Sequence, residues 1–146
     1  MTDKNEIVVP LSVFEVSYRK KIQYLTLNPW ILINRSKYGS GMGSKYKRQI
    51  QAKLMPYVLE AMNHGAHIEP ATQFTFVWTF RSKRIDLDNW AFVHKFVFDC
   101  FQESVLDGDK VFMPNDNLTY VRGLHDVYKG IDKRNPHVRI TWSSHE

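Results

Sequence analysis

The chain has one cysteine and no long apolar run. A single cysteine, Cys100, excludes an internal disulfide and any zinc site built on paired cysteines. We expect Cys100 to be a small buried residue on a helix rather than a nucleophile. No stretch approaches the roughly 20 apolar residues that cross a bilayer, and the first residues lack the apolar segment of a signal peptide. These absences favour a protein of a reducing compartment, so we expect a cytoplasmic location and no membrane partner.

Acidic residues are missing from a long internal stretch. Residues 16–59 contain no Asp or Glu, whereas bases recur throughout them, and the chain carries a formal net charge of +5. Many of the acids follow later, between residues 86 and 116. A basic segment beside an acidic cluster suits a polyanion that is held and then cut. The alternative is a solvated basic face without a partner.

Periodicity indicates both strands and helices. The clearest strand is 72–80, where four aromatic residues alternate with smaller ones and are expected to face the core. A helix is predicted from the N-cap Ser44 to about residue 64, ended by Gly65. A second helix is predicted from Asp88 to Glu103. Asn28-Pro29 indicates a turn, and residues 34–44 a loop.

Shorter alternating segments predict the remaining strands, at 11–18, 21–27, 118–128 and 138–142, the last two joined as a hairpin. A length of 146 residues is typical of one domain. The sequence therefore predicts a single α+β domain over residues 1–146, with a small mixed β-sheet and two main α-helices.

Two carboxylates mark the place where the 72–80 strand gives way to a helix. Asp86 and Asp88 are two residues apart, a spacing that points both side chains to one face of an extended backbone. Two like charges about 4 Å apart cost about 4 kcal/mol at an effective dielectric near 20. A cation between them, or a proton on one of them, relieves that cost. Three bases, Arg81, Lys83 and Arg84, come just before, so the segment predicts a divalent-metal site beside a phosphate-binding surface.

The helix after this pair carries further charges. Since each residue turns by about 100°, Asp88, Lys95 and Asp99 fall on one stripe of a continuous helix. Such a stripe lines a site or pairs internally, and Lys95 with Asp99 has the i, i+4 spacing of an ion pair. His64 and His67 lack the spacing of a zinc pair, and these two residues, His94 and His125 are all expected to be ordinary surface or core residues.

The chain resembles the RusA family of Holliday junction resolvases, DNA endonucleases common in phages and prophages. The resemblance rests on Asp86-Leu87-Asp88-Asn89, preceded by bases and followed by a helix with a lysine. A later acidic segment, 115–121, and Lys129 in the closing strands add to it. The front half is also similar, since Leu27-Asn28 leads through a basic loop into a helix that begins Lys45-Tyr46-Lys47. The likeness covers about residues 24–142.

The resemblance implies three metal-binding, catalytic aspartates, which carry over to Asp86, Asp88 and Asp116. The implied cofactor is Mg²⁺, with Mn²⁺ able to substitute. The family has a catalytic lysine one turn after the second aspartate, where this chain has Phe92, and Lys95 is the substitute on the same stripe. The segment before Asp116 is longer than in the family, so Asp107 and Asp109 stay open as the third ligand.

The implied function is a homodimeric, metal-dependent endodeoxyribonuclease that resolves four-way DNA junctions by paired phosphodiester hydrolysis. One alternative is a non-catalytic DNA-binding or recombination accessory protein with a structural aspartate cluster. Another is a small-molecule phosphohydrolase, which predicts no salt-dependent affinity for DNA. The bases expected to hold DNA backbones without reading sequence are Arg35, Lys37, Lys45, Lys47, Arg48, Arg81, Lys83 and Arg84.

Overall fold

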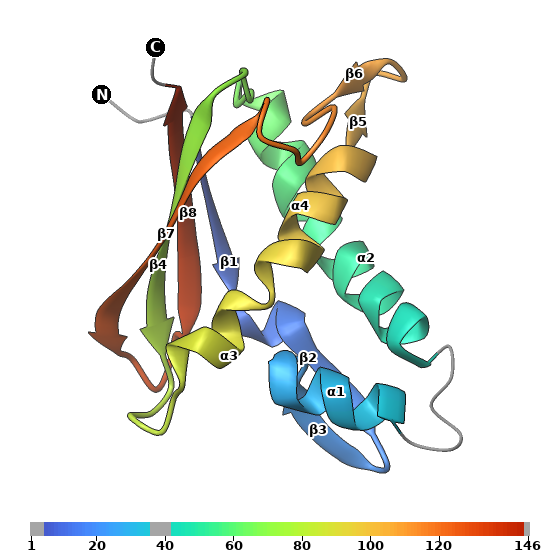
Figure 1. Cartoon of the computed structure of the whole chain (residues 1–146), viewed down its shortest axis with the longest axis vertical. Helices are drawn as coiled ribbons and strands as arrows, with labels where there is room; N and C mark the ends of the chain where they lie inside the picture. Colours follow the sequence, from blue (N-terminus) through green and yellow to red (C-terminus); the bar gives the residue numbers. More distant parts are fainter. Residues whose placement is uncertain (1–4, 36–41, 145–146) are drawn as a thin grey trace.

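A four-stranded sheet organises the computed structural model, which describes residues 5–35 and 42–144. The strands lie in the order β1-β8-β4-β7, and all pairs are antiparallel except β4 with β7, which run parallel. Their bounds are β1 Glu6–Pro10, β4 Thr72–Phe80, β7 Val121–Ile131 and β8 His137–Ser144. The helices gather on one side of this mixed sheet (Figure 1), so one face is covered and the other faces solvent.

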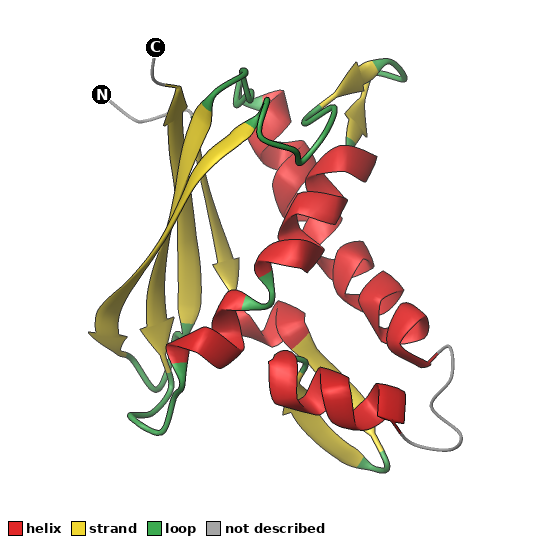
Figure 2. Ribbon diagram, viewed as in Figure 1, coloured by secondary structure: helices red, strands yellow, loops and turns green. Residues whose placement is uncertain are grey.

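The remaining elements complete a single α+β domain (Figure 2). They are the 3₁₀ helix η1 (Leu11–Phe14), the hairpins β2 (Glu15–Tyr18)–β3 (Lys21–Tyr24) and β5 (Val105–Leu106)–β6 (Lys110–Val111), and the helices α1 (Leu27–Arg35), α2 (Met42–Asn63), α3 (Leu87–Ala91) and α4 (His94–Glu103). Within the described ranges, no helix has both the length and the apolar character required to span a membrane.

The aromatic alternation of β4 forms the centre of the core, as predicted. Phe74, Phe76, Trp78 and Phe80 are each at most 1% exposed. Their rings meet those of the covering helices, as where Phe98 of α4 lies 5.0 Å from Phe74 between ring centroids. Cys100, also on α4, is fully buried, and burial raises the pKa of its thiol to about 11. The thiol is therefore protonated and unreactive at neutral pH.

Several predicted boundaries are wrong for local reasons. Asn28-Pro29 does not form a turn but lies in the first turn of α1, where the missing N–H of a proline costs nothing because that donor has no helical partner. The strand predicted at 11–18 begins only at Glu15, since Leu11–Phe14 form η1. Helix α2 starts at Met42, before the predicted N-cap Ser44, and continues through Pro56. Its predicted end is confirmed, since Gly65 follows the helix with φ +96°.

The predicted hairpin between the last two strands is also wrong. β7 and β8 follow each other in the sequence, but β4 lies between them and pairs with both. This arrangement flanks the aromatic strand on both sides, which buries it more completely than an edge position does. The predicted 88–103 helix is divided into α3 and α4, with residues 92–93 between them.

We expect Phe76→Ala to lower the free energy of unfolding by about 3–5 kcal/mol, because it leaves a cavity among packed rings. Urea denaturation followed by far-UV circular dichroism measures this loss. The matched control is Ile22→Ala, at a position that is 69% exposed, where a change within about 0.5 kcal/mol is expected. Equal losses of unfolding free energy in the two variants would contradict the central place of Phe76 in the core.

Candidate functional site

The Asp86–Asp88 pair lies at the start of α3, beyond the end of β4. Asp86 is the N-cap residue, with an extended backbone, and its Oδ1 accepts a hydrogen bond from the backbone N–H of Asp88 at 3.0 Å. Both residues are exposed. The pair therefore forms at a helix start, where capping holds it, and not by alternation along a strand as the sequence suggested.

Two neighbours of the pair fix α3 in place. Trp90 is 2% exposed, and its ring lies 4.9 Å from that of Tyr24 and 5.4 Å from that of Trp78. The Asn89 side chain accepts a hydrogen bond from the backbone N–H of Asn28 at 2.8 Å and donates one to Thr26 Oγ1 at 3.0 Å. The two carboxylates thus sit on a short helix tied both to the core and to the start of α1.

None of the candidate third carboxylates reaches the pair within one chain. Because β4 and β7 are parallel, Thr72 lies beside Val121 and Phe80 beside Ile131. The segment with Asp116 precedes β7 and so lies at the start of β4, whereas Asp86 and Asp88 follow its end. Nine residues of strand separate the two ends by about 26 Å.

Asp107 and Asp109 are equally remote. They belong to the β5–β6 hairpin, which Figure 1 shows at the same end of the molecule as the segment before β7 and away from α3. Among the described residues, no group of three or more His, Cys, Asp or Glu side chains is placed to hold a metal ion. Mg²⁺ is commonly bound through one or two carboxylates and several waters, so the exposed Asp86–Asp88 pair fits part of such a site.

Lys95 does not share a continuous stripe with Asp88. The helix is interrupted between them, and Lys95 is exposed on the first turn of α4. Asp99, one turn further on, forms an ion pair with Lys47 of α2 instead of Lys95. This pair connects α2 to α4, so Lys47 has a structural partner that the sequence did not reveal.

Exposed bases surround the end of the sheet that carries the carboxylates. Arg81, Lys83 and Arg84 lie in the loop before α3, as the sequence indicated. The turn after β7 lies beside them, because the backbone N–H of Asp132 donates to the Phe80 carbonyl at 2.9 Å. That turn adds exposed Lys133 and Arg134. Sequence reasoning missed these two because about 50 residues separate them from Arg81.

A second basic region lies between α1 and the β2–β3 hairpin. A hollow of about 570 Å³ is lined there by Tyr18, Arg19, Lys21 and Arg35, among other residues, and none of the lining residues is acidic. On the neighbouring helix α2, Lys45 and Arg48 are exposed. Lys37 lies outside the described residues. Arg35, Lys45 and Arg48 therefore face solvent on the acid-free part of the chain, as required for contacts with phosphates.

A partly buried polar cluster connects α4 to β7. His94 Nε2 lies 2.8 Å from Asp126 Oδ1, and Trp78 Nε1 donates to the same oxygen at 2.7 Å. Burial raises the pKa of Asp126, but hydrogen bonds from His94 and Trp78 outweigh it and lower the pKa below its ordinary value. No spacing in the sequence predicts this cluster, since its members lie on three separate elements.

Comparison with known proteins does not assign the chain to a family. No family model matches the sequence, and no curated protein is significantly similar to it.

We expect Asp126→Asn to lower the free energy of unfolding at pH 6 by about 1–3 kcal/mol, because hydrogen bonds to a charged group are lost. A lowered folded-state pKa means that this contribution is present above the unfolded value near 4 and is lost as pH falls through the folded value. The difference in the free energy of unfolding between the variant and the parent should therefore become smaller below about pH 4. Urea denaturation from pH 3 to 7 measures it, with exposed Asp109→Asn as control. A constant difference across this range would contradict the account.

Proposed function

We propose that the protein is a divalent-metal-dependent endonuclease acting on branched DNA, and that two copies of the chain form each active site together. The observation that carries this proposal is the exposed Asp86–Asp88 pair, held on a fixed helix start and surrounded by bases. Carboxylates within a basic surface suit a metal ion and the phosphates that it contacts.

The geometry of β7 supports a site shared between two chains. β7 is an edge strand, and no described strand pairs with its outer side. A two-fold axis at this edge would pair two copies of β7 in antiparallel fashion, so that the start of one lies beside the end of the other. The partner's Asp116, which precedes its β7, would then approach Asp86 and Asp88. The dimer would therefore bring together carboxylates that lie far apart within one chain.

The side chains of β7 also favour this interface. The strand is eleven residues long, whereas β1 at the opposite edge has five. Four of its large apolar residues are 41–53% exposed, namely Leu124, Val127, Tyr128 and Ile131. A long edge strand with exposed apolar side chains is prone to pair with another chain, although Arg122 and Lys129 of β7 oppose such pairing in part. A second copy of this chain would form hydrogen bonds with the backbone at the outer edge of β7, and it would cover the exposed apolar side chains.

The residues have defined roles in this proposal. A bound divalent ion would orient the scissile phosphate, promote ionisation of a water and stabilise the leaving oxygen. Asp86, Asp88 and the partner's Asp116 would supply its oxygen ligands. Arg81, Lys83 and Arg84 would hold the flanking phosphates, and Lys95 would neutralise charge near the reacting phosphate. Two such sites related by a two-fold axis match a four-way junction with the same symmetry.

One observation favours a second candidate, a DNA-binding protein without catalytic activity. The Asp86 carboxylate caps α3, so part of its role is structural whether or not a metal binds. Cleavage of a junction separates the two candidates, because only the first requires a metal ion. Asp88 is the better residue to alter, since its side chain does not cap the helix.

We expect Asp88→Asn to reduce cleavage of a synthetic four-way junction in Mg²⁺ by at least about 100-fold, since one oxygen ligand loses its charge. Junction binding, measured by fluorescence anisotropy in chelator, should stay within about twofold of the parent, because phosphate contacts come from the bases. Glu103→Gln, at an exposed position on α4, is the control for loss of one negative charge. Cleavage by Asp88→Asn at the parent rate would refute the metal site.

We expect the double variant Leu124→Lys/Val127→Lys to convert a dimer into a monomer, because lysines on an edge strand oppose pairing with another edge. Analytical ultracentrifugation measures the mass, and cleavage should be lost together with the dimer. Val8→Lys is the matched control, since Val8 is 47% exposed on β1 at the opposite edge of the sheet. A parent protein that is monomeric at all concentrations, or a variant that stays dimeric, would exclude this interface.

A further inference from the structure

A nucleotide-sized hollow opens at the carboxylate end of the sheet. It has a volume of about 300 Å³ and lies between the start of β2, the end of β3, the loop after β4 and the turn between β7 and β8. Arg81 contributes to its wall and lies five residues before Asp86, so the hollow and the Asp86–Asp88 pair occupy the same end of the molecule. A volume of this size is at the lower bound of small-ligand sites.

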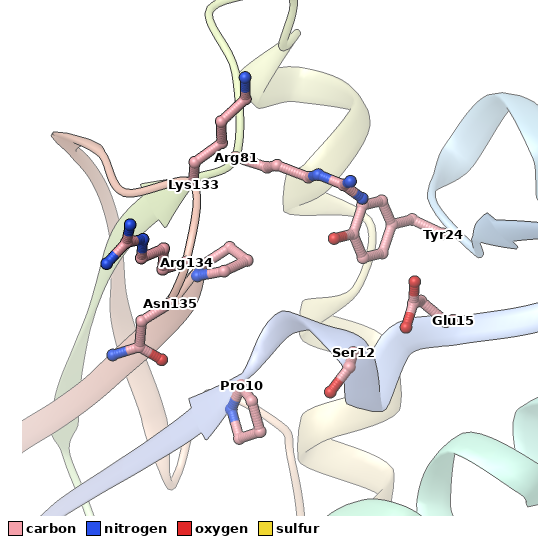
Figure 3. A pocket seen from close by; sticks show the side chains of 9 residues that line it. Pro10, Ser12, Glu15, Tyr24, Arg81, Lys133, Arg134 and Asn135 are labelled. Carbon is pink, nitrogen blue, oxygen red and sulfur yellow. The ribbon is translucent and has the colours of Figure 1, made fainter.

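The inner wall of the hollow combines an aromatic ring with both signs of charge. Figure 3 shows the Arg81 side chain extending toward the Tyr24 ring, with the Glu15 carboxylate on the other side of that ring. Burial and the nearby Glu15 carboxylate raise the pKa of Tyr24, while Arg81 opposes them. The Tyr24 hydroxyl therefore stays protonated at neutral pH and can donate a hydrogen bond.

The rim of the hollow is basic and part of its lining is apolar. Lys133 and Arg134 are exposed, and Figure 3 shows their charged ends extending away from the centre of the hollow. Pro10 and Pro136 lie next to each other on the lining, where the backbone N–H of Leu11 donates to the Pro136 carbonyl at 3.0 Å. Their half-buried rings provide flat apolar surface without a polar group.

This combination does not suit a simple anion, because Glu15 would repel it. A nucleotide carries a phosphate for the basic rim and a flat base with N–H donors for a carboxylate. Proteins that hold unpaired bases stack them on aromatic rings and hydrogen-bond their edges. A carboxylate can only accept hydrogen bonds. It therefore favours a base with an exocyclic amino group, as in the pairing of Glu with the amino group of cytosine.

We infer that this hollow binds one unpaired nucleotide, with its phosphate at Lys133 and Arg134 and its base against Tyr24 and Glu15, which lie opposite each other on β3 and β2. This inference rests on the proposed function, because it takes the ligand to be DNA. The base pairs that border a branch point lack a continuous stack, so a nucleotide there is easier to unpair than one inside a duplex. A nucleotide held here would position the strand relative to Asp86 and Asp88, which makes Glu15 and Tyr24 positioning residues.

The test uses DNA duplexes with a single unpaired nucleotide on one strand, bound in chelator so that cleavage plays no part. Three ligands differ only at that nucleotide, which is cytosine, thymine or an abasic residue. We expect the parent protein to bind the cytosine duplex about tenfold more tightly than the abasic duplex, since stacking of one base contributes about 1–3 kcal/mol. The thymine duplex should bind less tightly than the cytosine duplex, because thymine presents a carbonyl oxygen in place of the amino group.

Two variants and a control assign the contacts. Glu15→Gln should abolish the preference for cytosine over thymine, and Lys133→Ala/Arg134→Ala should weaken binding of all three duplexes by the same factor. Lys110→Ala replaces an exposed lysine at the opposite end of the molecule and should leave the affinity for all three duplexes unchanged. The Lys133/Arg134 pair lies in an exposed turn, so its replacement leaves the core intact.

The outcomes separate this inference from the proposed function. Equal affinity of the parent for the base-containing and abasic duplexes would overturn the nucleotide site and leave DNA binding intact. A uniform gain in affinity for all three duplexes in Glu15→Gln would also overturn it, since it would mean that the hollow binds phosphate alone. Absence of salt-dependent binding to any duplex would overturn the inference and the DNA-directed function together.

Discussion

The parallel pairing of β4 with β7 is the constraint on which the rest of the structure depends. β4 carries the aromatic core, so its position in the centre of the sheet is fixed by burial. The loop directly after β4 therefore lies at one end of the molecule, and the segment directly before β7 lies at the other. The carboxylate pair, its supporting residues Asn89 and Trp90, and the exposed bases Arg81, Lys133 and Arg134 gather at the first of these ends.

The same constraint separates Asp116 from Asp86 and Asp88 within a chain. A site that needs all three residues has to combine residues from two chains, and the unpaired edge of β7 offers a way to do so. Dimerisation would then strengthen metal binding, because the partner's Asp116 would add an oxygen ligand to the Asp86–Asp88 pair. In this proposal the partner chain would cover the exposed apolar side chains of β7, an edge strand that also carries Arg122 and Lys129.

The sequence predicted what depends on local pattern. Alternation in 72–80 predicts β4, and the apolar pattern after Asp88 predicts a helix near the point where α3 begins at Leu87. The position of β4 between β7 and β8 depends on which strands best bury its aromatic face. Adjacency in the sequence instead predicts that β7 and β8 pair with each other as a hairpin. Likewise Lys133 and Arg134, or His94 with Asp126, come together only through the sheet register, which no local pattern encodes. Asn28-Pro29 does not form the predicted turn, because a proline fits a helix start as well as a turn. Leu11–Phe14 form a short 3₁₀ helix in place of the predicted strand.

Subunit mixing tests the central claim most directly. The Asp88→Asn and Asp116→Asn chains, each alone, should fail to cut a four-way junction in Mg²⁺. Unfolded together and refolded as mixed dimers, they should regain nicking activity, because one of the two shared sites then has all its carboxylates. If mass spectrometry shows mixed dimers and the junction still stays intact, or if Asp116→Asn alone cuts at the parent rate, then the site is not shared between chains as proposed.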